Sequence, residues 1–152
     1  ISCSLVGSEM CIRDSLDTAS EIEKSVVNMV VDAEEDGYAI RAVTYKGSTE
    51  DGSGNGTLIC ANGSGYADMA SAADKAKYFS EMFRSMGMGS VTLYMNGDTP
   101  LQIALSENGK VVASDPATGV SSQILLSDNR GELKAKIVYS ASKGEWVIAE
   151  SY

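Results

Sequence analysis

The chain has 152 residues, of which 21 are acidic and 12 are basic, so its net charge at pH 7 is −9. This acidic balance argues against a protein that coats nucleic acid with its whole surface, but it leaves room for a basic patch on one face. No stretch reaches the roughly 20 apolar residues of a membrane span, and the lack of histidine excludes Ser-His-Asp triads, Cys-His pairs and histidine-ligated metals.

Residues 1–15 read as an artefact and not as part of a domain. The segment contains Cys3 and Cys11, whose spacing fits neither a C-x-x-C redox motif nor a metal site, and its apolar runs are too short for a secretory signal. Back-translation of residues 5–14 resembles a transposase adapter oligonucleotide used to build sequencing libraries. We therefore leave this segment out of the predicted fold and expect it to be loosely packed. We also expect that the true N-terminus, with an upstream domain, is missing from the chain.

About 137 residues remain, which is enough for one domain with a substantial core. Leaving out Arg13, Glu9 and Asp14 gives 11 bases and 19 acids, a net charge of −8, and Cys60 becomes the single cysteine. One cysteine cannot form an internal disulfide, so the fold must depend on its core. The expected location is cytoplasmic.

The first predicted element after this segment is a helix. Thr18-Ala19-Ser20-Glu21 is typical of a capping box. Apolar residues follow at helical intervals, although the β-branched pairs Val26-Val27 and Val30-Val31 could equally start a strand. We expect a short helix from about Thr18 that gives way to a strand before Glu34.

Two strands and a loop come next. A turn at residues 35–37 precedes a strand over Tyr38–Tyr45. A glycine-rich loop covers residues 47–56, and a short strand over Thr57–Cys60 ends at the turn Asn62-Gly63.

The following segment has the periodicity of one amphipathic helix. Its apolar residues recur in alternating steps of three and four: Met69, Ala72, Ala76, Phe79, Phe83 and Met86. We expect one helix over about Asp68–Met86, with Gly87 as its C-cap.

The rest of the chain predicts a β-meander with turns marked by Asn-Gly and related pairs. The expected strands are Val91–Met95, Leu101–Leu105, Lys110–Ala113, Gln123–Ser127, Glu132–Ser140 and Trp146–Tyr152. The predicted fold class is α+β, with antiparallel β-sheets and one or two helices on one face. We divide the chain into an α+β domain over residues 16–116 and additional strands of unknown role over residues 117–152.

Three small motifs could carry chemistry, but each has a simpler interpretation. Ser140-Ala141-Ser142-Lys143 fits S-x-x-K, yet it lies in a predicted hairpin turn. Residues 51–62 begin like a calcium loop but lack the bidentate Glu at the twelfth position. Cys60 lies in an apolar strand, which predicts a buried structural thiol. We therefore expect no enzyme, no metal site and no cofactor.

Four basic residues fall on the two predicted helical segments, namely Lys24, Lys75, Lys77 and Arg84. Basic helices on an acidic body could follow a phosphate backbone electrostatically. The alternative is that these are solvated helix faces on which acids balance the bases. The balancing acids would be Glu21, Glu23, Asp74 and Glu81.

Four short motifs then follow one another in a fixed order. They are Tyr78-Phe79-Ser80-Glu81-Met82-Phe83-Arg84-Ser85-Met86, Ser90-Val91-Thr92-Leu93-Tyr94-Met95, Asp98-Thr99-Pro100-Leu101-Gln102-Ile103 and Gly109-Lys110-Val111. In order and spacing they resemble the final half-domain of DNA sliding clamps of the proliferating-cell nuclear antigen type. Residues 33–42 are similar to an acidic hairpin and strand of the same family, so the resemblance covers about residues 18–114.

The resemblance implies a fragment of a DNA polymerase processivity factor built from β-α-β-β-β repeats. Such clamps are homo-oligomeric rings that encircle duplex DNA, with helices around the hole, and they bind DNA polymerase and other clamp-binding proteins. By position Lys24 and Arg84 would face the DNA, with Lys75 and Lys77 near a strand edge or helix entry. The resemblance also expects a strand through Ala76–Phe79 and then a short helix, in contrast to the single helix that periodicity predicts.

A second hypothesis belongs to a different class. The chain would be a non-enzymatic β-rich binding or structural module, extracellular if its two sequons, at Asn55 and Asn62, carry glycans. The orientation of Lys24 and Arg84 distinguishes the two hypotheses, because a DNA-encircling protein needs both on one concave helical face.

Overall fold

The computed structural model describes residues 12–47, 54–85, 101–127 and 132–151. Its elements are α1 (Ile12–Glu35), β1 (Ile40–Gly47), β2 (Gly54–Asn62), β3 (Gly65–Asp68), α2 (Ala72–Ser85), β4 (Leu101–Leu105), β5 (Val111–Val112), β6 (Ser114–Asp115), β7 (Val120–Ser121), β8 (Gln123–Ser127), β9 (Leu133–Ser140) and β10 (Glu145–Ser151).

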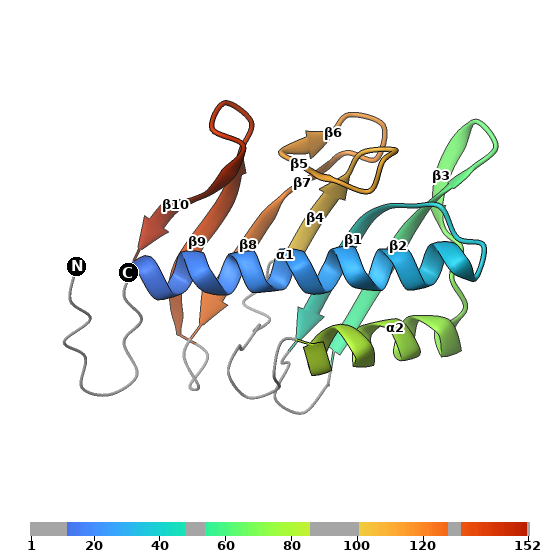
Figure 1. Ribbon diagram of the computed structural model, residues 1–152, viewed down its shortest axis with the longest axis horizontal. Helices are drawn as coiled ribbons and strands as arrows, with labels where there is room; N and C mark the ends of the chain where they lie inside the picture. The colour runs from blue at the N-terminus through green and yellow to red at the C-terminus, as the bar shows by residue number, and fades with distance from the viewer. Residues whose placement is uncertain (1–11, 48–53, 86–100, 128–131, 152) are drawn as a thin grey trace.

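The described strands form one large antiparallel sheet with both described helices on one face (Figure 1). The sheet has eight strands in the order β10-β9-β8-β4-β1-β2-β3, with β5 paired to β4, and β6 and β7 form a separate hairpin. Helix α1 crosses the sheet, and α2 lies beside its C-terminal half (Figure 1). The predicted α+β class with antiparallel pairing is confirmed.

Helix α1 is longer than the sequence predicted. Its buried apolar residues recur at helical spacing against the sheet: Ala19, Ile22, Val26, Met29, Val30 and Ala33. The expected change to a strand before Glu34 is wrong, because burial of this continuous stripe outweighs the weak strand preference of β-branched residues. Neither described helix is long and apolar enough to cross a membrane.

The start of α1 falls inside the segment that we excluded. The helix begins at Ile12, and Ser15 is 2% exposed. The expectation of a loose segment is therefore wrong for residues 12–15, while residues 1–11 lie outside the described part of the chain.

A glycine ends α1 and turns the chain into the sheet. Gly37 has φ +99°, which a side chain would strain. The amide of Gly37 donates to the carbonyl of Glu34 at 3.0 Å, and the amide of Tyr38 donates to that of Ala33 at 3.0 Å. This is the Schellman pattern, and it places the first residues of β1 directly below the last turn of α1.

Helix α2 is unbroken, as the periodicity predicted. Ser71 is its N-cap, since its hydroxyl accepts a hydrogen bond from the amide of Asp74 at 3.1 Å, so the helix begins later than the predicted Asp68. The residues Tyr78, Phe79, Met82 and Phe83 are buried. The strand through Ala76–Phe79 that the resemblance led us to expect is absent, because these residues lie within α2.

The main core lies between the helices and the sheet. Alternate residues of the central strands face it, including Val43 and Tyr45 of β1 and Leu101, Ile103 and Leu105 of β4. Strands β8 to β10 continue the same sheet, because β8 pairs with both β4 and β9.

The predicted strands agree with the structure to different degrees. Strands β4 and β8 have the predicted bounds, whereas β3, β6 and β7 were not expected. The ends of the predicted loop over residues 47–56 belong to β1 and β2. The predicted strand Val91–Met95 lies outside the described residues.

Candidate functional site

A β-bulge at the start of β1 sets the direction of Arg41. Ile40 pairs with Cys60 and Ala42 pairs with Ile59, so Arg41 is the extra residue on this strand. Ile40 packs in the main core, whereas Ala42 belongs to a smaller apolar cluster on the other face of the sheet. Bulges are common beside functional sites because they redirect a side chain.

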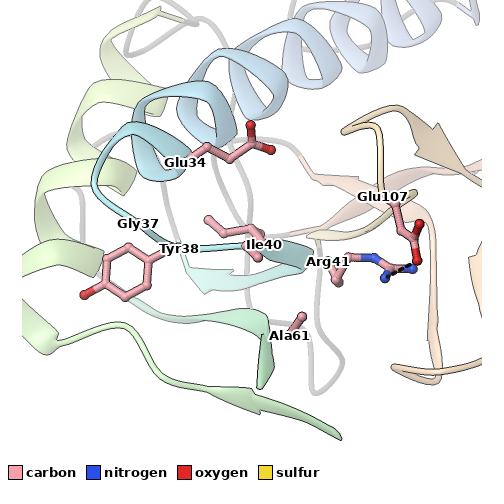
Figure 2. Close-up of a pocket in the computed structure, with 8 residues that line it drawn as sticks. Glu34, Gly37, Tyr38, Ile40, Arg41, Ala61 and Glu107 are labelled. Carbon is pink, nitrogen blue, oxygen red and sulfur yellow. Dashed lines mark ion pairs between the residues drawn. The ribbon is translucent and has the colours of Figure 1, made fainter. Parts of the chain in front are cut away.

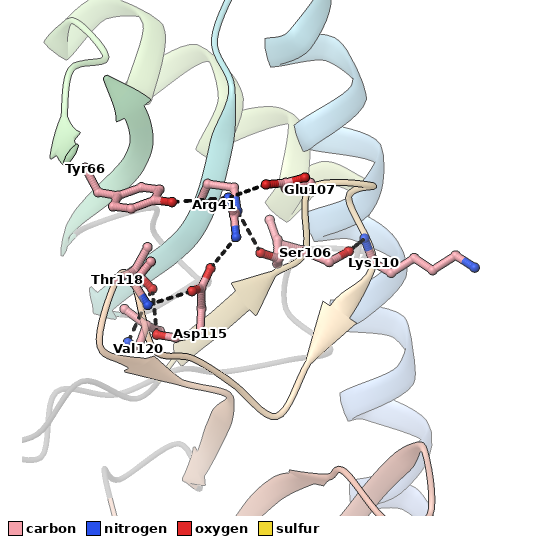
Figure 3. Close-up of polar contacts among 10 residues, drawn as sticks. Arg41, Tyr66, Ser106, Glu107, Lys110, Asp115, Thr118 and Val120 are labelled. Carbon is pink, nitrogen blue, oxygen red and sulfur yellow. Dashed lines mark hydrogen bonds and ion pairs between the residues drawn. The ribbon is translucent and has the colours of Figure 1, made fainter. Parts of the chain in front are cut away.

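The guanidinium of Arg41 joins four strands (Figure 3). Its Nε donates to the carbonyl of Leu105 at 3.1 Å, and Nη2 donates to Oδ2 of Asp115 at 2.8 Å. Nη1 lies 3.5 Å from the hydroxyl of Tyr66 and 3.9 Å from Oε1 of Glu107. The guanidinium carbon is 5.5 Å from the centroid of the Tyr66 ring. With 16% of its side chain exposed, Arg41 is held in one orientation.

The carboxylate of Asp115 is fixed by the hairpin of β6 and β7. Asp115 is 6% exposed, and its Oδ1 accepts a hydrogen bond from the amide of Ala117 at 2.9 Å. Its carbonyl accepts one from Gly119, which has φ +72°. A buried carboxylate needs a paired charge, so Asp115 and Arg41 neutralise each other.

A cavity of about 520 Å³ opens beside Arg41, between the end of α1 and the turn joining β4 to β5 (Figure 2). We call it the Arg41 pocket. It is lined by Glu34, Gly37, Tyr38, Ala39, Ile40, Arg41, Ala61 and Glu107. A side chain at Gly109 in the β4–β5 turn would begin 3.9 Å from Oε1 of Glu34, so this turn lies close to the last turn of α1.

The charged side chains of the pocket that are exposed to solvent are carboxylates. Glu34 and Glu107 are exposed, and among the described residues Glu107 pairs only with Arg41, at 3.9 Å. No hydrogen bond or ion pair joins the Glu34 carboxylate to another described residue. The negative end of the α1 dipole lies at the same place.

Beside the Arg41 pocket, two hydrogen-bonded tyrosine–aspartate pairs join the end of α1 to α2. The hydroxyl of Tyr38 donates to Oδ2 of Asp74 at 2.5 Å, and the hydroxyl of Tyr78 donates to Oδ2 of Asp36. The two rings meet edge to face with centroids 6.2 Å apart. We call these four residues the tyrosine–aspartate clip, which fastens the end of α1 to α2.

The clip changes the acidity of its members. The hydrogen bond from Tyr78, together with Lys77, lowers the pKa of Asp36 below its ordinary 3.8. The hydrogen bond to Asp74 raises the pKa of Tyr38. Burial raises the pKa of Tyr78, and the hydrogen bond to Asp36 adds to this effect. Both tyrosines therefore stay protonated at neutral pH and act as donors.

The bases predicted to face DNA do not gather at this pocket. Lys24 is exposed on α1. On α2, Lys75 pairs with Asp68 at 2.7 Å, Lys77 pairs with Asp36 at 3.3 Å, and Arg84 pairs with Glu81. Only Glu81 among these acids belongs to the balancing set predicted from the sequence.

Sequence reasoning missed Arg41, although a signal was present. It is the single charged residue in the apolar run Tyr38–Tyr45, and a lone charge in a buried strand needs a partner. That partner, Asp115, lies 74 positions away along the chain, and no sequence pattern links the two residues.

Two other sequence interpretations can be compared with the structure. Cys60 is a buried free thiol, as predicted, and burial raises its pKa. Ser140 and Lys143 lie at the turn between β9 and β10, where the Ser140 hydroxyl accepts a hydrogen bond from the Lys143 amide at 3.3 Å. The turn interpretation of S-x-x-K is confirmed.

Comparisons with protein families, with curated proteins and with solved structures found no match to this chain. Within the described ranges, no group of three or more Cys, Asp and Glu side chains is placed to hold a metal ion. The function is therefore argued from the geometry of the pocket.

Proposed function

We propose that the chain is a non-enzymatic β-rich binding module that holds a small ligand in the Arg41 pocket. The observation that carries this proposal is the fixed position of Arg41 on the wall of a cavity of about 520 Å³. Ligand pockets commonly measure about 300–1,000 Å³ and combine apolar walls with a few oriented polar groups. Ile40, Ala39 and Ala61 supply the apolar part here.

The lining favours binding over catalysis. None of the eight lining residues is Ser, Cys, Lys or His, so the wall has no serine, thiol or amine nucleophile with an imidazole or lysine base beside it. Arg41 already donates to the carbonyl of Leu105 and to Asp115, and a guanidinium has hydrogen-bond donors but no acceptor. The polar groups of the pocket can therefore orient a ligand.

Binding can be tested by nuclear magnetic resonance of the ¹⁵N-labelled chain. A library of small cations, anions and neutral compounds is added, and the backbone amide signals are followed. Ligands of the Arg41 pocket should shift Gly37 and Ala61, which line it, and leave Gly144 in the β9–β10 turn unchanged. If no compound shifts the two pocket amides in preference to Gly144, the proposal fails.

The sliding-clamp function stays a prediction and is our second proposal. One observation supports it, because α1 and α2 lie side by side on one face of the sheet (Figure 1). The charges give it less support. Lys75, Lys77 and Arg84 are paired within the chain, and α1 carries seven acids against two bases.

Duplex binding separates the two proposals. The fluorescence anisotropy of a labelled 30-base-pair duplex is measured in the presence of the chain at about 50 mM and 150 mM salt, because phosphate contacts weaken steeply over that range. We expect no saturable binding at either salt concentration. Saturable binding that Lys24→Gln and Arg84→Gln each weaken would favour the clamp.

A further inference from the structure

We propose that the ligand of the Arg41 pocket is a small organic cation, a primary ammonium group on a short apolar body. This inference rests on the proposed function and adds the chemical class of the ligand. It is carried by the charges around the cavity, by the position of the carboxylates above its apolar floor and by the end of α1.

The single positively charged residue of the pocket lining, Arg41, is already paired with a carboxylate of the chain. Arg41 is bonded to the buried carboxylate of Asp115 at 2.8 Å and to the carbonyl of Leu105 at 3.1 Å. An anionic ligand would have to compete with Asp115 for the guanidinium, and it would also approach Glu34 and Glu107. The negative charges of the ligand and of these two carboxylates would repel each other, so the lining disfavours an anion.

Both carboxylates of the lining can receive a cation, Glu34 because it is unpaired among the described residues and Glu107 because its ion pair with Arg41 is long, at 3.9 Å. Glu34 extends from the last turn of α1 above Ile40, and Glu107 approaches from the β4–β5 turn (Figure 2). Glu34 has no partner among the described residues, and the carboxyl-terminal end of α1 adds a partial negative charge. An ammonium group has three donors and no acceptor, which matches carboxylate oxygens.

The floor of the pocket sets the rest of the ligand. Ala39 and Ala61 present methyl groups, Ile40 lies beneath them with 3% of its surface exposed, and Gly37 presents only backbone. The side chain of Tyr38 points away from Ile40 and Arg41 in Figure 2, and its hydroxyl is held by Asp74. A short aliphatic chain can therefore lie on these groups.

The test compares three probes that share a four-carbon chain: butylammonium, butan-1-ol and pentanoate. Titrations follow the amide signals of Gly37 and Ala61 in the full chain. Butylammonium should bind the most tightly and should weaken as salt rises. Stronger binding of pentanoate or butan-1-ol would overturn the cation assignment and leave the proposed function standing, whereas no response to any probe or to the wider library would end both.

Matched variants locate the charge. Glu34→Gln should raise the dissociation constant for butylammonium about two- to fivefold, the usual size for an exposed ion pair, and Glu107→Gln should act in the same direction. Glu35→Gln is the control, because Glu35 is an exposed carboxylate on the same helical turn that does not line the pocket. An equal effect of Glu35→Gln, or none at Glu34, would contradict the proposal.

Discussion

At the scale of single residues, Gly56 is a position where the packing leaves no room for a side chain. Gly56 lies in β2 directly under α2, and a Cβ placed on it would be 2.5 Å from the ring of Phe79 and 2.7 Å from the carbonyl of Thr44. The carbonyl is part of the β1–β2 ladder and cannot move without breaking the sheet. Phe79 in turn is confined between Tyr45 and Phe83, with ring centroids 5.2 Å and 6.2 Å away.

We predict that Gly56→Ala lowers the free energy of unfolding by about 1–3 kcal/mol, the usual cost of overpacking. Urea unfolding followed by circular dichroism measures it. Gly65→Ala is the control, since a Cβ at Gly65 meets only the carbonyl of Asn62 at 3.9 Å. Like Gly56→Ala, Gly65→Ala lowers the conformational entropy of the unfolded chain, and without a clash it should be neutral or slightly stabilising. Equal stability of the two variants would contradict the packing argument.

At the scale of the secondary-structure elements, the tyrosine–aspartate clip and the ion pair of Lys77 with Asp36 link the end of α1 to α2. Tyr78 is 1% exposed, and its hydroxyl would be a buried unsatisfied donor without Asp36. The clip fixes the end of α1, and with it the position of Glu34 above the Arg41 pocket.

We predict that the clip makes stability depend on pH in the acid range. The pKa of Asp36 is lowered in the folded state, so Asp36 contributes stability that is complete above its ordinary pKa of 3.8 and is lost as the pH falls through the lower folded value. The difference in the free energy of unfolding between the wild-type chain and Asp36→Asn should therefore be largest near pH 6 and should narrow below about pH 4. Urea titrations at pH 6, 4 and 3 measure it.

Asp32→Asn provides the control for this pH series. Asp32 is an exposed carboxylate near the same end of α1, and no hydrogen bond or ion pair joins it to another described residue. Its substitution should show no comparable narrowing. A constant difference between the wild-type chain and Asp36→Asn from pH 6 to pH 3 would show that the ionised carboxylate of Asp36 stabilises the fold no more than its neutral form.

The elements differ in how far the sequence predicts them. The bounds of β4 and β8 follow from alternating apolar residues between turn signals, and α2 follows from its periodicity. The length of α1 was underestimated because its β-branched residues favour a strand when the sequence is considered alone. In the fold, burial of the apolar stripe against the sheet favours the helix. The Arg41 pocket was not predictable, because it depends on a bulge and on an ion pair between distant segments, which only the folded sheet brings together.

At the scale of the whole molecule, α1 connects the two ends of the sheet. Its N-terminal half packs against β9 and β10, where Nε1 of Trp146 donates to Oε1 of Glu23 at 2.6 Å. Its C-terminal half packs against α2 through the clip. Strand β8 meets β4 over only two residue pairs, Leu101 with Ile124 and Gln102 with Gln123. The division of the chain at residue 116 stays a prediction, and this arrangement gives reasons to expect one cooperative unit.

We predict that a chain ending at Pro116 does not fold as an independent domain. The truncation removes β7 to β10, and α1 loses its contacts with β9 and β10. We expect this loss to expose part of the apolar stripe in the N-terminal half of α1, where Ala19 and Ile22 are fully buried in the intact chain. It also removes Val120, which covers Ala42 and Ala104 on the other face of the sheet. Far-ultraviolet circular dichroism and heat unfolding of the truncated and complete chains measure the effect.

A single unfolding transition in the complete chain, detected equally by Trp146 fluorescence and by circular dichroism, should accompany this result, because Trp146 reports on β10 and circular dichroism reports on all elements. A cooperative transition in the truncated chain would instead place a domain boundary near residue 116. In that case α1 would belong with β1 to β4 alone, and its contacts with β9 and β10 would be an interface between two domains.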